Sequence, residues 1–175
     1  NGLTEGMRFF ISSWANIDRE FLDLASNCNI HIISFGIESG CQEILNFYQT
    51  NIQIAHISDL IQYANSKGIF TVGNFILGAP IESNDSIEQT FALIRECEFD
   101  QINIKILDYM IGSTLYSSLP ESLKKHDHVF ASAENGLTVF SVEELTSRRD
   151  AFVKDYYAKH RERLAEKIRR FGTPY

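Results

Sequence analysis

Residues 30–40 read IHIISFGIESG, and this stretch decides the fold class. Its first eight residues are rich in β-branched and apolar side chains, without the strict alternation that a half-exposed strand shows. Such a run is typical of a strand that lies inside a parallel sheet and is buried on both faces. We therefore predict a buried, parallel strand at residues 30–37, which ends in a loop that carries glycine and glutamate.

The same pattern recurs on either side of that stretch. Apolar runs at residues 7–13, 69–77 and 102–107 predict three more strands. Apolar residues at helical spacing predict a helix after each of the first three strands. Asn16, Ser83 and the Ser141–Glu144 pair have the side chains and spacing of helix N-caps. The first expected helix follows Asn16. The others cover residues 42–48, 52–67, 83–96 and 142–171. Gly68 ends the helix at 52–67, and Gly172 and Pro174 end the last one.

Strands that alternate with helices predict βα units and a mostly parallel sheet with right-handed crossovers. Four such units are about half of a (β/α)₈ barrel, which needs ~250 residues. The predicted fold class is α/β, with parallel βα repeats that form part of a TIM-like barrel and a long C-terminal helix. A small open sheet is the alternative. We expect the barrel part to span residues 1–118, and an extension with the long amphipathic helix packed on the barrel to span 119–175.

Composition and charge narrow the class of protein. The chain has 44% hydrophobic and 22% charged residues, a formal net charge of −7 and a pI of about 5.2. This balance argues against charge-driven binding to nucleic acid or to an anionic membrane. Basic residues on the last helix, among them Arg163 and Lys167, are interspersed with acids, which favours a solvated face. No apolar run reaches the ~20 residues that a bilayer requires.

The three cysteines are Cys28, Cys41 and Cys97. Their spacing matches neither a zinc site nor a disulfide framework, so we expect no metal site in this chain and three reduced thiols. An odd number of cysteines suits a reducing compartment, and the N-terminus lacks the pattern of a signal peptide. We therefore expect a cytoplasmic protein.

The candidate site lies in the loops at the carboxyl ends of the strands, where ligands bind in parallel α/β sheets. Glu38 can accept two hydroxyl hydrogen bonds, as from a ribose. Gly78 and Pro80 shape a turn that keeps the end of a strand open, and Asp108 can accept a bond from an amine. The alternative reading is that Glu38 caps the next helix and that the glycines only make tight turns.

The order of these segments resembles the radical S-adenosylmethionine superfamily. The matching stretches are SFGIESGCQEIL at residues 34–45, GNFILGAPIES at 73–83 and IGSTLY at 111–116, with a helix that ends in KGI between the first two. The resemblance covers residues 7–116 and implies that the four strands are the third to sixth of a partial barrel.

The resemblance implies reductive cleavage of S-adenosylmethionine (SAM) to a 5′-deoxyadenosyl radical, and it implies cofactors and a binding site. The cofactors are SAM and a [4Fe–4S] cluster, whose CxxxCxxC motif is absent from this chain, so we expect the chain alone to be inactive. Three departures concern the same site: no basic residue at 13–16, no lysine at 49–51, and Ile111-Gly112-Ser113 where the family has PGT. The implied binding residues are Glu38, Ser39, Asn74, Gly78, Leu107 and Asp108.

Within the superfamily, the pattern is most similar to members with an upstream cobalamin-binding domain. These include the anaerobic magnesium-protoporphyrin monomethyl ester oxidative cyclases and several methyltransferases. The implied partner is a small-molecule substrate that the sequence does not identify, and no residue of this chain is assigned a catalytic role. A non-catalytic βα binding module is the alternative function. The exposed edge of the strand at residues 7–13 predicts either pairing with a second copy of the chain or a segment of the chain that covers this edge.

Overall fold

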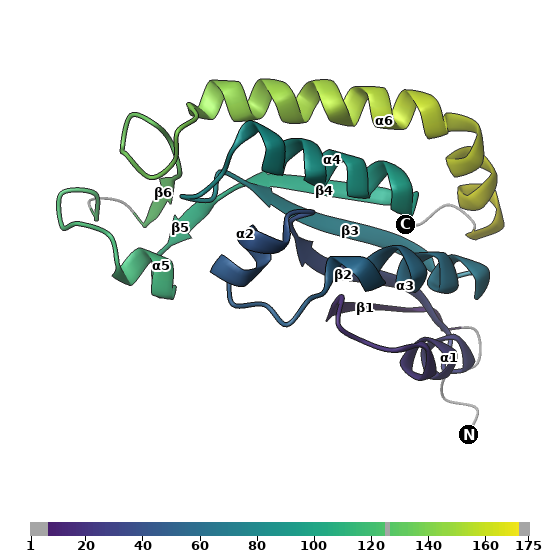
Figure 1. Ribbon diagram of the computed structural model, residues 1–175. Helices are drawn as coiled ribbons and strands as arrows, with labels where there is room; N and C mark the ends of the chain where they lie inside the picture. Colours follow the sequence, from purple (N-terminus) through teal and green to yellow (C-terminus); the bar gives the residue numbers. More distant parts are fainter. Residues whose placement is uncertain (1–6, 125–126, 172–175) are drawn as a thin grey trace.

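The computed structural model describes residues 7–124 and 127–171, and a four-stranded parallel sheet forms its centre (Figure 1). The strands lie in the order β1-β2-β3-β4, and a two-stranded antiparallel ribbon, β5-β6, follows β4. The elements in chain order are β1 (Phe9–Trp14), α1 (Arg19–Asn27), β2 (Ile30–Glu38), α2 (Gln42–Phe47), α3 (Ile54–Ser66), β3 (Phe70–Leu77), α4 (Asn84–Cys97), β4 (Gln101–Ile106), β5 (Asp108–Met110), α5 (Thr114–Ser117), β6 (His128–Phe130) and α6 (Val142–Phe171).

The strand order identifies a barrel segment. Each strand lies next to the strand that follows it in the sequence, and each pair is parallel. Right-handed crossovers between strands in such an order place all the connecting helices on one face. Figure 1 shows α3 and α4 on the same side of the sheet. The predicted fold class, part of a TIM-like barrel followed by a long helix, is therefore confirmed.

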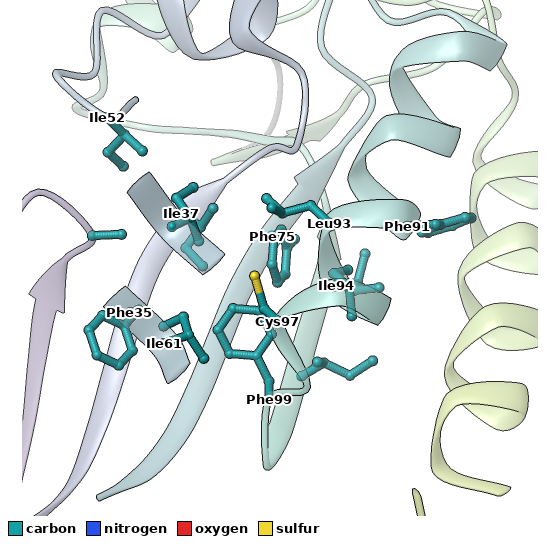
Figure 2. Close-up of a cluster of buried hydrophobic side chains, with 14 of the residues drawn as sticks. Phe35, Ile37, Ile52, Ile61, Phe75, Phe91, Leu93, Ile94, Cys97 and Phe99 are labelled. Carbon is teal, nitrogen blue, oxygen red and sulfur yellow. The ribbon is translucent and has the colours of Figure 1, made fainter. Parts of the chain in front are cut away.

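The hydrophobic core lies between the sheet and these helices (Figure 2). Side chains at alternate positions of the strands, such as Ile33, Phe35 and Phe75, point into it and are at most 1% exposed. Phe91 of α4 stacks on Phe152 of α6, with ring centroids 4.0 Å apart. The long helix thus completes the same core, as expected of a helix packed on the barrel.

The other face of the sheet, which we call the open face, carries a row of hydrogen-bonded polar side chains across β2 to β4. Asn74 Nδ2 donates to Ser34 Oγ (2.7 Å) and to the Phe35 carbonyl (2.9 Å), and Asn103 Nδ2 donates to Asn74 Oδ1 (3.0 Å). Lys105 on β4 is exposed on this face. The prediction that residues 30–37 are buried on both faces is therefore wrong, because the crossovers bring helices to one face only.

The helix caps agree with the sequence in all but one case. Ser83 and Ser141 cap α4 and α6, the latter by a reciprocal pair of bonds with Glu144 (2.8 and 3.1 Å). The cap of α1 is Asp18, whose carboxylate accepts from Phe21 N at 2.8 Å, so the prediction of Asn16 is wrong. Asp18 stands directly before the first helical turn, where an acceptor can reach its free amides. Gly172 and Pro174, expected to follow α6, lie outside the described residues.

A buried ion cluster fixes the C-terminal half of α6. The Asp100 carboxylate is fully buried at the amino end of β4 and accepts from Thr71 N at 2.8 Å. Arg163 (3.2 Å) and Lys167 of α6 bind the same carboxylate. The expectation that Arg163 and Lys167 lie on a solvated face is therefore wrong: both are partly buried, and burial lowers the pKa of Lys167.

β1 is an edge strand that pairs only with β2 among the described residues. Pairing of its free edge with a second copy of the chain stays a prediction. No helix within residues 7–124 and 127–171 combines the length and the hydropathy needed to cross a membrane.

We expect Asp100→Asn to lower the free energy of unfolding by about 3 kcal/mol, because it leaves Arg163 and Lys167 partly buried without their carboxylate. Urea denaturation followed by circular dichroism measures this loss. The matched control is Asp155→Asn, which removes an exposed pair with Lys159 on the same helix (2.8 Å). It should cost less than ~0.5 kcal/mol. Equal losses in the two variants would contradict a special role for Asp100.

Candidate functional site

The candidate site lies at the carboxyl ends of β1 to β4, where the open face meets the connecting loops. α2, α5 and the β5-β6 ribbon gather at this end of the sheet, while the C-terminal part of α6 lies at the other end (Figure 1). A small second cluster of buried residues, which contains Leu107, Tyr109 and Val129, covers this end, and Ile76 of β3 packs against it. The predicted boundary between residues 118 and 119 stays a prediction.

Glu38 is the last residue of β2, and its carboxylate stands on the open face. Its backbone has φ +73°, a left-handed conformation that ends the strand. An added Cβ at Gly36 would lie 3.1 Å from Glu38 Oε1 and 3.2 Å from Cε3 of Trp14, so glycine keeps the gap between them open. Burial raises the pKa of Glu38, against the opposing charge of Lys105. The predicted binding carboxylate is thus at the site.

The two residues after Glu38 anchor the loop to α4. The buried Ser39 hydroxyl lies 3.2 Å from Thr90 Oγ1 and accepts from Cys41 N at 3.1 Å, and Gly40 N donates to Thr90 Oγ1 at 2.9 Å. An added Cβ at Gly40 would lie 2.5 Å from Thr90 Cα. Gly40 is therefore required for close approach to the helix. Contact of Ser39 with a ligand stays a prediction. In the structure its hydroxyl makes hydrogen bonds that hold the loop to α4.

The turn after β3 is held by a buried carboxylate. Gly78 adopts φ +98° and donates its N–H to Glu82 Oε2 at 3.0 Å. Ser86 donates to the other oxygen of Glu82, and burial raises the pKa of this carboxyl. Gly78 therefore makes the predicted turn. Glu82 shapes the loop from within, because its side chain is only 4% exposed.

The remaining predicted residues already have internal partners. Asn74 belongs to the row of hydrogen bonds on the open face. Leu107 N donates to the Leu77 carbonyl (2.7 Å), and the Leu107 carbonyl accepts from Ala131 N (2.9 Å). Asp108 Oδ2 pairs with His128 Nδ1 at 2.5 Å. The structure therefore brings Glu38, Asn74 and Gly78 to one end of the sheet, and Leu107 and Asp108 continue from β4 beside them. Their contact with a ligand stays a prediction.

Trp14 and Tyr48 also stand at this end of the sheet, and sequence reasoning did not select them as candidates. Trp14 ends β1 beside Glu38 and is 57% exposed. The Tyr48 hydroxyl, at the end of α2, is buried and makes no hydrogen bond within the described residues. Burial raises the pKa of Tyr48, and the charges of Glu82 and Glu38 raise it further. The signal for Trp14 was available: an aromatic residue that directly ends a strand. Tyr48 gave none, because its position depends on how α2 packs.

Among curated proteins, the chain is similar to methyltransferases, a putative methylthiotransferase and a cyclase. It is 29% identical to cytidylyl-2-hydroxyethylphosphonate methyltransferase of Streptomyces wedmorensis over 106 residues, which are 57% of this chain and 20% of the methyltransferase. It is 22% identical over 111 residues to the anaerobic magnesium-protoporphyrin IX monomethyl ester cyclase of Cereibacter sphaeroides, which covers 63% of this chain and 18% of the cyclase. The chain thus spans about a fifth of the length of these relatives. No family model matches it.

Solved structures with the same fold are radical SAM enzymes. Coproporphyrinogen III oxidase from Escherichia coli aligns with a TM-score of 0.66 and 16% identity, over 85% of this chain and 32% of the oxidase. The radical SAM methyltransferase TsrM from Kitasatospora setae, solved with cobalamin and a [4Fe–4S] cluster, aligns with a TM-score of 0.53 and 16% identity, over 58% of this chain and 21% of TsrM. The predicted resemblance to the partial barrel of radical SAM enzymes is therefore confirmed.

We expect Glu38→Gln to stabilise the fold at neutral pH. The folded state favours the protonated carboxyl, so Glu38 contributes stability below its ordinary pKa of 4.5, and this contribution is lost as the pH rises through the raised folded value. The variant should therefore unfold at higher denaturant concentration than the wild type at pH 7, with the difference shrinking towards pH 4. A variant that is less stable than the wild type at pH 7 would show that the charge of Lys105 affects the pKa of Glu38 more strongly than burial does.

We expect Gly40→Ala to lower the free energy of unfolding by about 1–3 kcal/mol, because a methyl group there overlaps the backbone of α4. Thermal unfolding monitored by circular dichroism measures the loss. Gly36→Ala is the control, since its Cβ would meet only side-chain atoms at 3.1 Å or more, which can move apart. If the two variants unfold alike, the loop after β2 does not depend on contact with α4.

Proposed function

We propose that this chain is part of a radical SAM enzyme and that its open face lines the site where SAM is cleaved. The observation that carries this proposal is the Glu38 carboxylate, held at the end of β2 over a gap that Gly36 keeps open. The fold and the similarity to methyltransferases and a cyclase support it. The reaction proposed for the whole protein is methyl transfer or tetrapyrrole cyclisation on a small-molecule substrate, in the cytoplasm.

The residues present fit the nucleoside part of SAM. A carboxylate that is partly buried, on a face with amide side chains and a glycine gap, can accept hydrogen bonds from ribose hydroxyls. In this proposal Glu38 orients the ribose, Ser39 and Gly40 fix the loop that carries Glu38, and Asn74 holds the neighbouring strands in register. Gly78, Leu107 and Asp108 border the adenine. In this proposal the residues of this chain bind and orient the nucleoside of SAM, and the second cluster of buried residues excludes water at this end of the sheet.

The iron–sulfur cluster would need ligands from elsewhere in the protein. Cys28 is exposed at the end of α1, Cys41 is buried beside Ile44 and Ala79, and Cys97 is buried in the main core. Burial raises the pKa of Cys97 to about 12, so its thiol remains protonated at neutral pH. The cluster would supply the electron for cleavage of SAM. In members of the cobalamin type, cobalamin would be bound by a separate domain.

We expect the protein from the complete reading frame, reconstituted anaerobically with iron and sulfide, to cleave SAM to 5′-deoxyadenosine, which chromatography with mass detection measures. Glu38→Ala should weaken SAM binding about tenfold or more, because it removes hydrogen bonds to a charged acceptor. Glu43→Ala, which changes an exposed glutamate on α2, is the control and should leave binding unchanged.

A well-folded protein that neither holds a cluster nor binds SAM would favour the alternative, a non-catalytic βα module. One observation supports this non-catalytic alternative. Several polar atoms of the candidate site already have hydrogen-bond partners within the chain, notably those of Ser39, Asn74 and Leu107.

A further inference from the structure

Trp14 is the one tryptophan of the chain, and its place is unusual. It ends β1 on the open face, with 57% of its surface exposed. Tryptophan is highly buried on average, because its large ring gains most from leaving water. The proposed function assigns roles to Glu38 and to the residues that border the adenine, but none to the Trp14 ring. An exposed indole at the carboxyl end of a strand therefore calls for an explanation from its surroundings.

The indole and the Glu38 carboxylate face one gap. Trp14 is the register partner of Gly36 on the neighbouring strand. A Cβ at Gly36 would lie 3.2 Å from Trp14 Cε3, 3.5 Å from Trp14 Cζ3 and 3.1 Å from Glu38 Oε1. The six-membered part of the ring and a carboxylate oxygen thus border the same small volume, which stays open because residue 36 has no side chain.

Both walls of this gap attract positive charge. A carboxylate does so by its charge, and the face of an indole does so by its quadrupole, for which tryptophan is the strongest of the aromatic side chains. The lysine whose charge acts on Glu38, Lys105, stands on β4, at the far side of the sheet from β1. The gap is therefore suited to a cationic centre and not to an anion.

We propose that Trp14 and Glu38 form a subsite for the sulfonium centre of SAM. This inference rests on the proposed function, in which the ribose binds at Glu38 and the adenine lies towards β3 and β4. The 5′ substituent of the nucleoside then points towards β1, where Trp14 stands. The positive sulfur contacts the ring, and no step of bond formation is involved. Residues 13–16 contain no basic side chain that would repel the sulfonium charge.

The test compares SAM with S-adenosylhomocysteine, its neutral thioether counterpart, on the reconstituted protein from the complete reading frame. Isothermal titration calorimetry measures both affinities in the wild type, Trp14→Phe and Trp14→Leu. We expect Trp14→Leu to weaken SAM binding about fivefold and binding of the thioether less than twofold. Trp14→Phe should weaken SAM binding by an intermediate amount. The Trp14 emission, taken as the difference between wild type and Trp14→Phe, should be quenched by SAM and much less by the thioether.

Two further variants separate this role from a structural one. Gly36→Ala fills the gap and should weaken SAM while the protein stays folded. Phe10→Leu removes another exposed aromatic side chain from β1, away from the carboxyl end, and should change neither affinity. If the wild type binds SAM but Trp14→Leu binds it equally well, the subsite is refuted and the proposed function stands. If the wild type binds no SAM, the proposed function fails and the subsite with it.

Discussion

The handedness of the βα crossover is the constraint on which the rest of the structure depends. Consecutive strands are neighbours in the sheet, and βα crossovers are right-handed almost without exception, so the connecting helices pack on one face, where they share one core. Apolar side chains such as Phe35 and Phe75 therefore form the main core on that face. On the opposite face, polar side chains hydrogen-bond to one another across the strands, as those of Asn74 and Asn103 do, and exposed aromatic side chains such as Trp14 lie beside them. A core on one side and an uncovered face on the other follow from one rule of chirality.

Most of the fold could be predicted from the sequence. The strands at residues 30–38 and 70–77 and the helices that begin after Ser83 and Ser141 gave strong local signals, because periodicity and caps depend on nearby residues alone. The β5-β6 ribbon was not predicted: its strands have three residues each and pair across a long loop. Burial on both faces was predicted for β2 from apolar content, which does not report which face the helices cover.

The convergence of the candidate residues could be predicted, because the carboxyl ends of parallel strands lie together wherever such a sheet forms. What the sequence did not reveal is how its polar atoms are already used. Ser39 has the same residue type whether it faces a ligand or Thr90, and only the packing of α4 decides between them. The roles of Arg163 and Lys167 were hidden in the same way, because their partner Asp100 is more than sixty residues away.

The Asp100 cluster and the Glu38 gap lie at opposite ends of the same sheet. What holds α6 in place is therefore separate from what would contact a ligand, and side chains at the carboxyl end can be exchanged without loosening the anchor. Loop substitutions at the carboxyl end would therefore change the ligand contacts of this chain while the ion cluster at the amino end keeps α6 anchored.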